Sequence, residues 1–514
     1  MVREIIHLQV GQCGNQIGNV FWESICKDHQ LSESGSLISD PETSKNKLRL
    51  QTEKMSVYFA ESSDNKYVPR AIMLDTDPGP LEVVKAGRIG KMFNPDNYVA
   101  GASSVLGGYG RSYLTESSQI IEEYTEVLQK ELEVKSQKKK KRVKTEKKRK
   151  GGEVQLCDSP QGFQVMHSLG GSTGSGLGTL LLEHLRNNYP TLVTSSFSVL
   201  PSQLIVETYH AILGLSQLID HSHATFTIDN ASLFNICKRT LKSSNPTYKD
   251  LNWITSLAMN GVTSSFRRVQ NNNTKEEISL SQKKKKKKIN YFYIVIAGDY
   301  RIPCKLNDDL HKMRLNLIPF PRLHFLLMSH YPFFKVDESK KVDTSVSTMT
   351  DYLWSSVSSL ANIVPGDGKY LSDSFVIRGE NVSMNIWDVF NMSSHMAEDF
   401  VNFIPNLIKI TVIPLAPTYT PLNGTLLCNT TCIKNTFAAL SSTFSQLFQR
   451  KTMLHRFTRE GIDELQFSES HANVQSLISE YQDKQDVVVD LENELDAVDE
   501  ENSIEQNNES DFYE

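Results

Sequence analysis

A glycine-rich segment from Gly170 to Gly178 carries the strongest chemical signal in the sequence. It contains five glycines together with Ser172, Thr173 and Ser175, directly before a run of helical character. Glycine lets the main chain approach a ligand closely, and the N–H groups and dipole of a helix N-terminus favour negative charge. The segment therefore predicts a binding site for phosphate.

The spacing of this segment excludes two common phosphate motifs. No Lys follows its last glycines, as a Walker A loop requires, and residues 174–178 lack the spacing of the dinucleotide fingerprint. A Rossmann oxidoreductase would also need a ribose-binding acid that the sequence does not supply at the right place. A tight strand-to-helix turn without a ligand is the alternative interpretation. A second glycine-rich turn at Gly11–Gly18 favours a ligand.

Two carboxylates, Asp75 and Asp77, follow the apolar residues Met73 and Leu74. A triphosphate bound without a lysine needs a cation, and Mg²⁺ is held by one or two carboxylates together with water and phosphate oxygens. We therefore expect Mg²⁺ near these two residues. Taken alone, the same segment also fits an ordinary acidic turn.

The elements that must position these residues alternate between strand and helix. Apolar residues alternate up to Val10, before the first glycine-rich turn, and residues 162–167 form a second strand before the second turn. This alternation over the first 230 residues predicts a Rossmann-like α/β domain with a parallel, doubly wound sheet. Ligands of such sheets sit at the carboxyl ends of the strands, where both turns would lie.

The carboxyl-terminal part of the chain predicts two amphipathic helices. Their apolar residues recur at helical spacing and are Phe437, Leu440, Phe444 and Leu447 in the first helix, and Val474, Leu477, Ile478 and Tyr481 in the second. We expect the two helices to pack as a hairpin against the body. Short apolar runs between about 302 and 430 predict a second α/β domain before them.

The composition describes a soluble globular protein of 514 residues, with 39% hydrophobic residues and a net charge of −5. Residues 135–150 carry eleven Lys or Arg and one Glu, 268–301 carry nine Lys or Arg and three acids, and 490–514 carry eleven acids. These three blocks are expected to lie outside the core, and the last of them to be disordered. The strongly acidic remainder argues against nucleic acid as a partner.

The seven cysteines are odd in number and lack the C-x-x-C spacing, which indicates reduced thiols rather than a disulfide scaffold or a structural zinc site. No stretch approaches the roughly 18 uninterrupted apolar residues of a membrane span. The apolar start of the chain is too short and too polar for a signal peptide. We therefore expect a cytoplasmic chain with no membrane partner.

Five segments together resemble the tubulin family, and most its beta chain. They are the first eighteen residues, Gly171–Gly176, Ile228–Asn230, Pro246–Asn252 and Pro319–Phe325. The resemblance runs from residue 1 to about 489. It implies a GTP-binding domain at 1–247 with a basic insertion at about 134–156, a core helix at 248–267, a second insertion at 268–301, an intermediate domain at 302–432, a helical hairpin at 433–489 and an acidic tail at 490–514.

The family's pattern implies a GTP/GDP site with Mg²⁺ in this chain. It places Gln12, Cys13 and Gln16 near the nucleotide, Ser168, Ser172, Thr173 and Gly174 around the phosphates, Glu207 by the ribose, Asn230 and Asn252 at the guanine edge, Tyr248 on the base and Asp77 at the magnesium. Paired side-chain amides can discriminate guanine, and an aromatic face contributes about 1 to 3 kcal/mol of stacking.

The resemblance also places Lys312 at a subunit contact, where a beta-type chain has Lys and an alpha chain has Glu. A beta-type chain would touch the alpha chain's nucleotide through Lys312, and its own GTP would be hydrolysed only when a neighbour's carboxylate positions the water. The implied function is a structural constituent of microtubules that pairs with alpha-tubulin in the cytoplasm and cytoskeleton. Microtubule-associated proteins and motors are further partners that the resemblance implies.

Two departures from the family's pattern support a second interpretation. Residues 335–343 lack the aromatic residue of the lateral-contact loop, and the insertion at 268–301 falls in the loop that meets the next subunit. The alternative is a regulator that binds alpha-tubulin but caps or sequesters it. The composition of 268–301 also suggests the hypothesis of an unspliced intron, which an in-frame transcript would refute.

Overall fold

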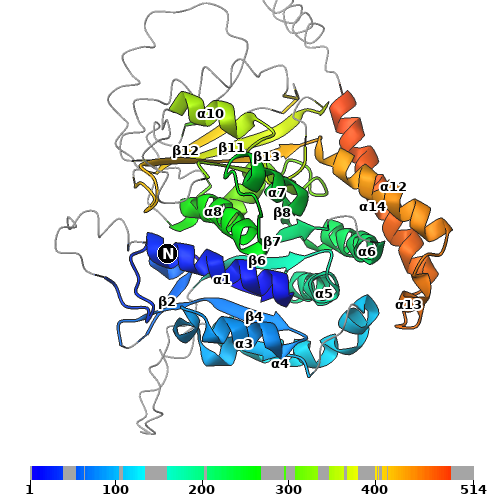
Figure 1. Ribbon diagram of the computed structural model, residues 1–514, viewed down its shortest axis with the longest axis horizontal. Coiled ribbons are helices and arrows are strands. Elements are labelled where there is room, and N and C mark those ends of the chain that lie inside the picture. Colours follow the sequence, from blue (N-terminus) through cyan, green and yellow to red (C-terminus); the bar gives the residue numbers. More distant parts are fainter. Residues whose placement is uncertain are drawn as a thin grey trace, which may run out of the picture.

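The computed structural model describes residues 3–38, 54–62, 64–102, 108–132, 159–201, 205–267, 307–333, 346–363, 367–379, 408–413 and 415–487, with a few isolated positions besides. One large sheet runs through this part of the chain (Figure 1). Its strands are β1 (Glu4–Val10), β4 (Ala71–Asp75), β5 (Tyr98–Ala100), β6 (Pro160–Ser168), β7 (Val193–Leu200), β8 (Ala224–Asp229), β9 (Val295–Ile296), β10 (Phe325–Tyr331), β11 (Tyr370–Gly379), β12 (Ile408–Ile413) and β13 (Leu422–Thr430). A separate pair is formed by β2 (Phe59–Glu61) and β3 (Tyr67–Pro69).

The strand order of the large sheet is β5-β4-β1-β6-β7-β8-β10-β13-β11-β12-β9. The strands from β5 to β8 are all parallel, and β1 lies between β4 and β6, with Leu8 opposite both Ile72 and Val165. This arrangement confirms the predicted parallel sheet of the amino-terminal part. Beyond β8 the sheet is mixed, because β13 runs antiparallel to both β10 and β11.

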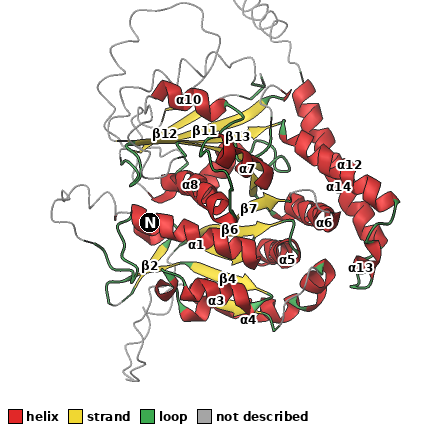
Figure 2. Ribbon diagram, viewed as in Figure 1, coloured by secondary structure: helices red, strands yellow, loops and turns green. Residues whose placement is uncertain are grey.

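Helices cover both faces of this sheet (Figure 2). One apolar cluster joins the sheet to α1 (Gly11–Asp28), α3 (Pro78–Ala86), α7 (Asn230–Arg239), α8 (Tyr248–Arg267) and α9 (Leu310–Leu317). The other joins it to α4 (Ser117–Leu132), α5 (Ser172–Asn188), α6 (Ile205–His221) and α10 (Val346–Trp354). Ile5 belongs to the first cluster and Ile6 to the second, as the alternating side chains of a strand require. Both faces of the strand are therefore buried, as is usual for a parallel sheet.

The two predicted carboxyl-terminal helices are α12 (Ile433–Gln449) and α14 (Glu464–Asp486), joined through the short α13 (Leu454–Thr458). They form a hairpin that packs against α6. The ring of Tyr209 on α6 lies 5.6 Å from that of Phe444 on α12 and 5.5 Å from that of Phe467 on α14. The apolar stripes thus bury their aromatic residues against α6, as the spacing predicts.

The three charged blocks lie almost wholly outside the described residues. The exception is β9 (Val295–Ile296), whose main chain pairs in parallel with β12 at the edge of the sheet. These two residues thus lie at the edge of the sheet, and the expectation that the block lies outside the core stays a prediction. Within the described residues, no helix combines the length and the apolar character needed to cross a membrane.

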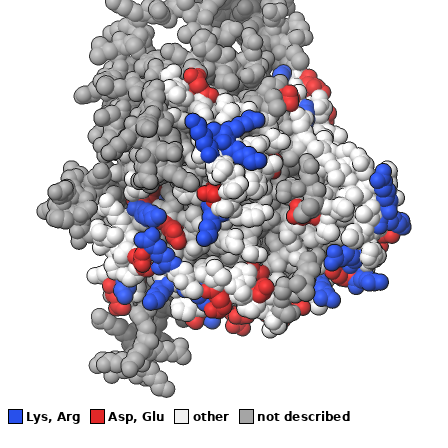
Figure 3. All heavy atoms as spheres, viewed as in Figure 1, with Lys and Arg blue, Asp and Glu red and all other residues white. Residues whose placement is uncertain are grey.

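Charged side chains on the face shown in Figure 3 are mostly interspersed, and the largest basic group gathers near α7. Lys238 and Arg239 end that helix and Lys242 follows it, and all three are exposed. Cations in the last turn complement the negative end of the helix dipole. This arrangement accounts for the basic group without a ligand.

Four fully buried histidines make the fold sensitive to acid. Burial lowers the pKa of His7 and His330 to about 3 and that of His167 and His324 to about 4. In the unfolded chain these rings take up protons below about pH 6.5, so stability is complete above that pH and falls as the pH drops towards the folded values. Each ring should remove about 2 kcal/mol by about pH 5.

Replacing His7 with Phe should therefore reduce the loss of stability between pH 6.5 and pH 5. Neither ring nitrogen of His7 has a hydrogen-bond partner among the residues that the structure describes, and the ring lies 5.2 Å from Phe21 and 5.8 Å from Trp22, so an aromatic hydrocarbon suits the position. Urea unfolding at both pH values measures the difference. An unchanged pH dependence in the variant would contradict this account.

Candidate functional site

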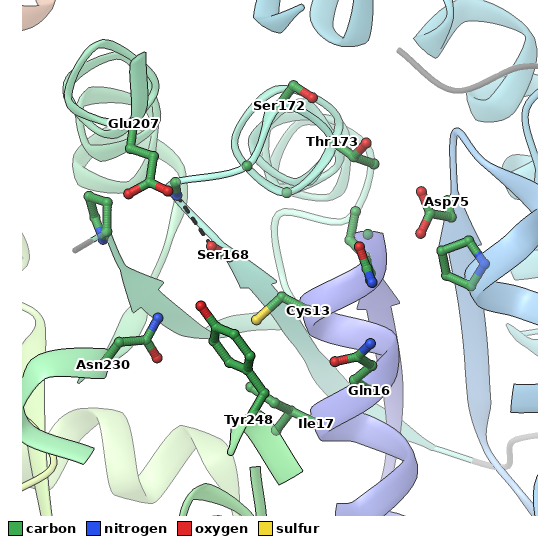
Figure 4. Close-up of a pocket in the computed structure, with 18 of the residues that line it drawn as sticks. Cys13, Gln16, Ile17, Asp75, Ser168, Ser172, Thr173, Glu207, Asn230 and Tyr248 are labelled. Carbon is green, nitrogen blue, oxygen red and sulfur yellow. Dashed lines mark hydrogen bonds between the residues drawn. The ribbon is translucent and has the colours of Figure 1, made fainter. Parts of the chain in front are cut away.

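A cavity of about 480 Å³ opens at the carboxyl ends of β1, β4, β6 and β7. Its wall brings together residues from segments far apart in the sequence (Figure 4). All twelve residues that the sequence analysis assigned to nucleotide and metal line it: Gln12, Cys13, Gln16, Asp77, Ser168, Ser172, Thr173, Gly174, Glu207, Asn230, Tyr248 and Asn252. Their individual roles remain predictions.

The phosphate side of the cavity is the turn between β6 and α5. Helix α5 begins at Ser172, and the hydroxyl of Ser168 accepts a hydrogen bond from the N–H of Gly170 at 3.2 Å. A Cβ on Gly174 would lie 2.4 Å from the carbonyl oxygen of Ser168, so only glycine fits there. The first turn of α5 therefore offers its N–H groups and the hydroxyls of Ser172 and Thr173 to an anion.

The first glycine-rich turn packs against the second. Gly11 has a φ of +73°, which favours glycine, and a Cβ placed on it would meet the N of Gly174 at 3.4 Å. Asn15 holds this turn in place, because its side-chain amide donates to the carbonyls of Gly11 at 3.0 Å and Leu74 at 3.1 Å. The two turns and the end of β4 thus form one connected cradle.

The acidic side of the cavity contains Asp75 and Asp77, which the structure gives different surroundings. Asp77 caps α3, since its Oδ1 accepts the N–H of Gly79 at 2.9 Å. Asp75 is buried, and its Oδ2 has no hydrogen-bond partner among the described residues. Burial raises the pKa of Asp75 to about 6. A buried carboxylate oxygen without a partner is suited to bind a cation.

The family's pattern assigned only Asp77 to the metal, although the sequence analysis had considered Asp75 together with it. The position of Asp75 at the end of an apolar strand was the feature of the sequence that pointed to it. The list also omitted Thr76, whose hydroxyl lies 2.8 Å from that of Thr173. This contact ties the acidic side of the cavity to the phosphate side. No group of three His, Cys, Asp or Glu side chains forms a protein-only metal site within the described ranges.

The remaining wall is formed by Asn230, Tyr248 and Asn252 from the starts of α7 and α8. Figure 4 shows the ring of Tyr248 between Asn230 and Cys13, facing the cavity. Tyr248 is 65% exposed, so one face of its ring is free for a planar ligand. Burial raises the pKa of the Cys13 thiol to about 12, which keeps it neutral. Amides beside an open aromatic ring suit a nucleobase.

Comparison with known proteins identifies the family of this site. Residues 4–141 and 135–238 match the Tubulin/FtsZ family, GTPase domain, and residues 321–442 match the tubulin C-terminal domain. The tubulin beta-3 chain of Echinococcus multilocularis is 37% identical over 494 residues, which cover 95% of this chain and 97% of the relative. This chain belongs to the tubulin family. The beta chain of Saccharomyces cerevisiae is 36% identical over 96% of both chains, and the beta-6 chain of Gallus gallus is 36% identical over 96% of this chain and 97% of its own length.

These full-length similarities make the chain a divergent beta-type tubulin, and its GTPase domain implies that it binds GTP and GDP. Features of this tubulin's cavity fit such a ligand. Asp75 Oδ2 and Glu207 Oε2 are buried oxygens without a partner among the described residues, and the N-terminus of α5 opens on the cavity at Ser172. These features fit a ligand that brings donors, a cation and an anionic group.

Lys312 lies away from the cavity of this tubulin. It stands in the first turn of α9, where its Nζ donates to Asp308 at 2.6 Å. Helix α9 is fastened to the amino end of β6, because the N–H of Leu310 donates to Gln161 at 2.9 Å. Asp309 at the cap of α9 also pairs with Arg3, just before β1, at 2.7 Å. Lys312 and the cavity are thus at opposite ends of the same parallel strands.

Proposed function

We propose that this chain is a beta-tubulin-like GTP-binding constituent of microtubules that pairs with alpha-tubulin. One observation carries the proposal: the cavity opens at the carboxyl ends of β1 and β6, whereas Lys312 lies at their amino ends. Two related chains stacked head to tail would therefore bring the Lys312 end of one to the nucleotide of the next. The named relatives are beta chains of tubulin along their whole length, which supports this arrangement.

In the proposed complex, the cradle between β6 and α5 binds the phosphates and the amides of Asn230 and Asn252 read guanine. Tyr248 stacks on the base and Glu207 accepts from the ribose. Asp75 and Asp77 hold Mg²⁺, which offsets the phosphate charge. The chain's own residues bind and orient GTP, and the carboxylate that positions the attacking water comes from the neighbouring subunit.

The same proposal places the chain in the cytoplasm, in microtubules. Microtubule-associated proteins and motors would meet it on the outer hairpin of α12 and α14. The alternative, a regulator that caps or sequesters alpha-tubulin, was favoured by segments 268–301 and 335–343, which apart from Val295–Ile296 lie outside the described residues. Similarity to beta chains over the full length does not favour it.

Two measurements test the proposal. Purified heterodimer should bind GTP with Mg²⁺ at least a hundredfold more tightly than ATP, because a site built to pair a substrate's polar groups rejects an analogue that leaves them unpaired. A tagged copy expressed in cells should be incorporated along microtubules. Equal affinity for ATP would reject the guanine site, and a diffuse or end-restricted signal would favour the capping alternative.

Replacing Lys312 with Glu should cause hydrolysis of the GTP bound by the alpha partner. The change supplies a carboxylate at the position where the family's alpha chains carry one, so it can position water on that nucleotide. Lys312→Gln, which removes the charge without adding a carboxylate, serves as the control. The nucleotide recovered from assembled polymer measures the outcome, and undiminished GTP in the Glu variant would contradict the assigned orientation.

A further inference from the structure

His210, which the sequence analysis did not single out, touches the phosphate turn from behind. It lies on α6, one turn after Glu207, and does not line the cavity. Its Nδ1 lies 2.9 Å from the carbonyl oxygen of Gly170. Because a carbonyl only accepts, Nδ1 must carry the proton. Burial lowers the pKa of His210 to about 4, so the ring is neutral at pH 7.

Two aromatic rings fix the plane of His210. The ring of Tyr109 stacks on it at 5.9 Å, and the ring of Phe457 on α13 meets it edge-on at 5.5 Å. The α13 corner is itself anchored, since Glu460 Oε2 accepts the N–H of Gly110 at 2.8 Å. The outer hairpin and the segment that contains Tyr109 therefore hold the imidazole in one orientation.

The contact with Gly170 has a geometric consequence for the cavity. In a planar trans peptide, the carbonyl of one residue and the N–H of the next point in opposite directions. Holding the Gly170 oxygen towards His210 therefore turns the N–H of Gly171 away from it. Gly171 lines the cavity and lies directly before the first residue of α5.

We propose that His210 is a positioning residue that directs the Gly171 N–H towards the phosphates of the bound nucleotide, with Phe457 of the outer hairpin holding its ring. The inference rests on the proposed GTP site. The rate at which nucleotide is released would then depend on the packing of Phe457 on α13 against His210. His210 touches no nucleotide in this scheme and acts only through the main chain of Gly170.

Substitution of His210 separates its hydrogen bond from its packing. Phe retains the ring between Tyr109 and Phe457 but has no donor, and Nε2 of His210 has no partner to lose within the described ranges. Asn has its amide N–H near the place of Nδ1, so His210→Asn should restore the bond. His324→Phe is the matched control, because His324 is also buried and does not line the cavity. Its ring nitrogens lie 2.9 Å from the carbonyl oxygen of Pro321 and 3.2 Å from that of Leu218, and the neutral ring donates to one of the two.

The experiment measures release of a fluorescent GTP analogue from full-length heterodimer after a chase with unlabelled GTP. His210→Phe should accelerate release about fivefold to tenfold, His210→Asn should stay within about threefold of the unaltered chain, and His324→Phe should leave the rate unchanged. Circular dichroism verifies that each variant is folded. Acceleration by Phe together with rescue by Asn would not result from a loss of packing alone.

Equal release rates for the unaltered chain and folded His210→Phe would overturn the inference while leaving the GTP site intact. Release from His210→Asn as fast as from His210→Phe would overturn it too, because the hydrogen bond would then not be the cause. If both variants fail to fold, His210→Gln is measured in the same chase. Its side-chain amide reaches the place of Nε2 and not that of Nδ1, so this variant lacks the bond to Gly170. It should release GTP faster than the unaltered chain, and an equal rate would overturn the inference. Failure of the unaltered chain to bind GTP would reject the proposed function, and the inference with it.

Discussion

Replacing Asn252 with Leu should raise the dissociation constant for GTP about a hundredfold. Leu has nearly the same shape but neither donates nor accepts, so polar groups on the guanine edge would be left unpaired in a partly buried cavity. The affinity for ATP, which lacks the matching pattern, should change much less. The preference for guanine would therefore shrink by about the same factor. Competition binding with both nucleotides in the presence of Mg²⁺ measures it.

Asn19 provides the control for this experiment. It lies on α1 beside the site but does not line the cavity, and its Oδ1 has no hydrogen-bond partner in the part of the chain that the structure describes. Asn19→Leu should leave both affinities unchanged. Equal effects of the two substitutions would mean that Asn252 acts through the stability of the fold, and its assignment to the guanine edge would be withdrawn.

Replacing Asp75 with Asn should raise the Mg²⁺ concentration needed for half-maximal GTP binding about a hundredfold. The substitution keeps the size of the side chain and removes the charge of a buried carboxylate whose Oδ2 has no hydrogen-bond partner within the described part of the chain. Removal of an outer hydrogen bond to a metal ligand weakens metal binding about tenfold to hundredfold, and removal of a ligand itself should reach at least the upper end of that range. Titration of Mg²⁺ at fixed GTP gives the value.

Asp77→Asn distinguishes the two carboxylates. Asn caps a helix about as well as Asp, so this change removes the charge of Asp77 and retains the hydrogen bond from Gly79. If Asp77 is a ligand as well as a cap, its variant should need about tenfold more Mg²⁺ with unchanged thermal stability. An Mg²⁺ requirement that stays the same in both variants would exclude this end of β4 as the metal site.

The composition of the cavity wall was predictable because its residues lie in short segments at the ends of strands. Gln12 and Ser172 follow glycines, and a parallel sheet must bring such turns together at one edge. The division of labour between Asp75 and Asp77 was not predictable. Which of two neighbouring acids becomes the helix cap depends on local dihedral angles, and the residue spacing does not reveal them.

Contacts between distant residues were also beyond the reach of the sequence. Thr76 meets Thr173, and His210 meets Gly170, only because β4, β6 and α6 converge at one end of the sheet. Polar residues such as Thr and His occur widely on helices and strands, so neither residue stood out. The resemblance to a known family supplied the roles of the residues, and physical pattern alone gave a phosphate site with a cation.

The junction between β8 and β10 has a mechanical consequence. These strands run parallel, with Phe325 opposite Thr225, so the sheet passes without a break from the half that contains the cavity into the half that follows α9. A load applied along the strand direction would be borne in shear by successive main-chain hydrogen bonds, which must rupture together. The molecule should therefore transmit tension as a stiff body and yield first at its helical exterior.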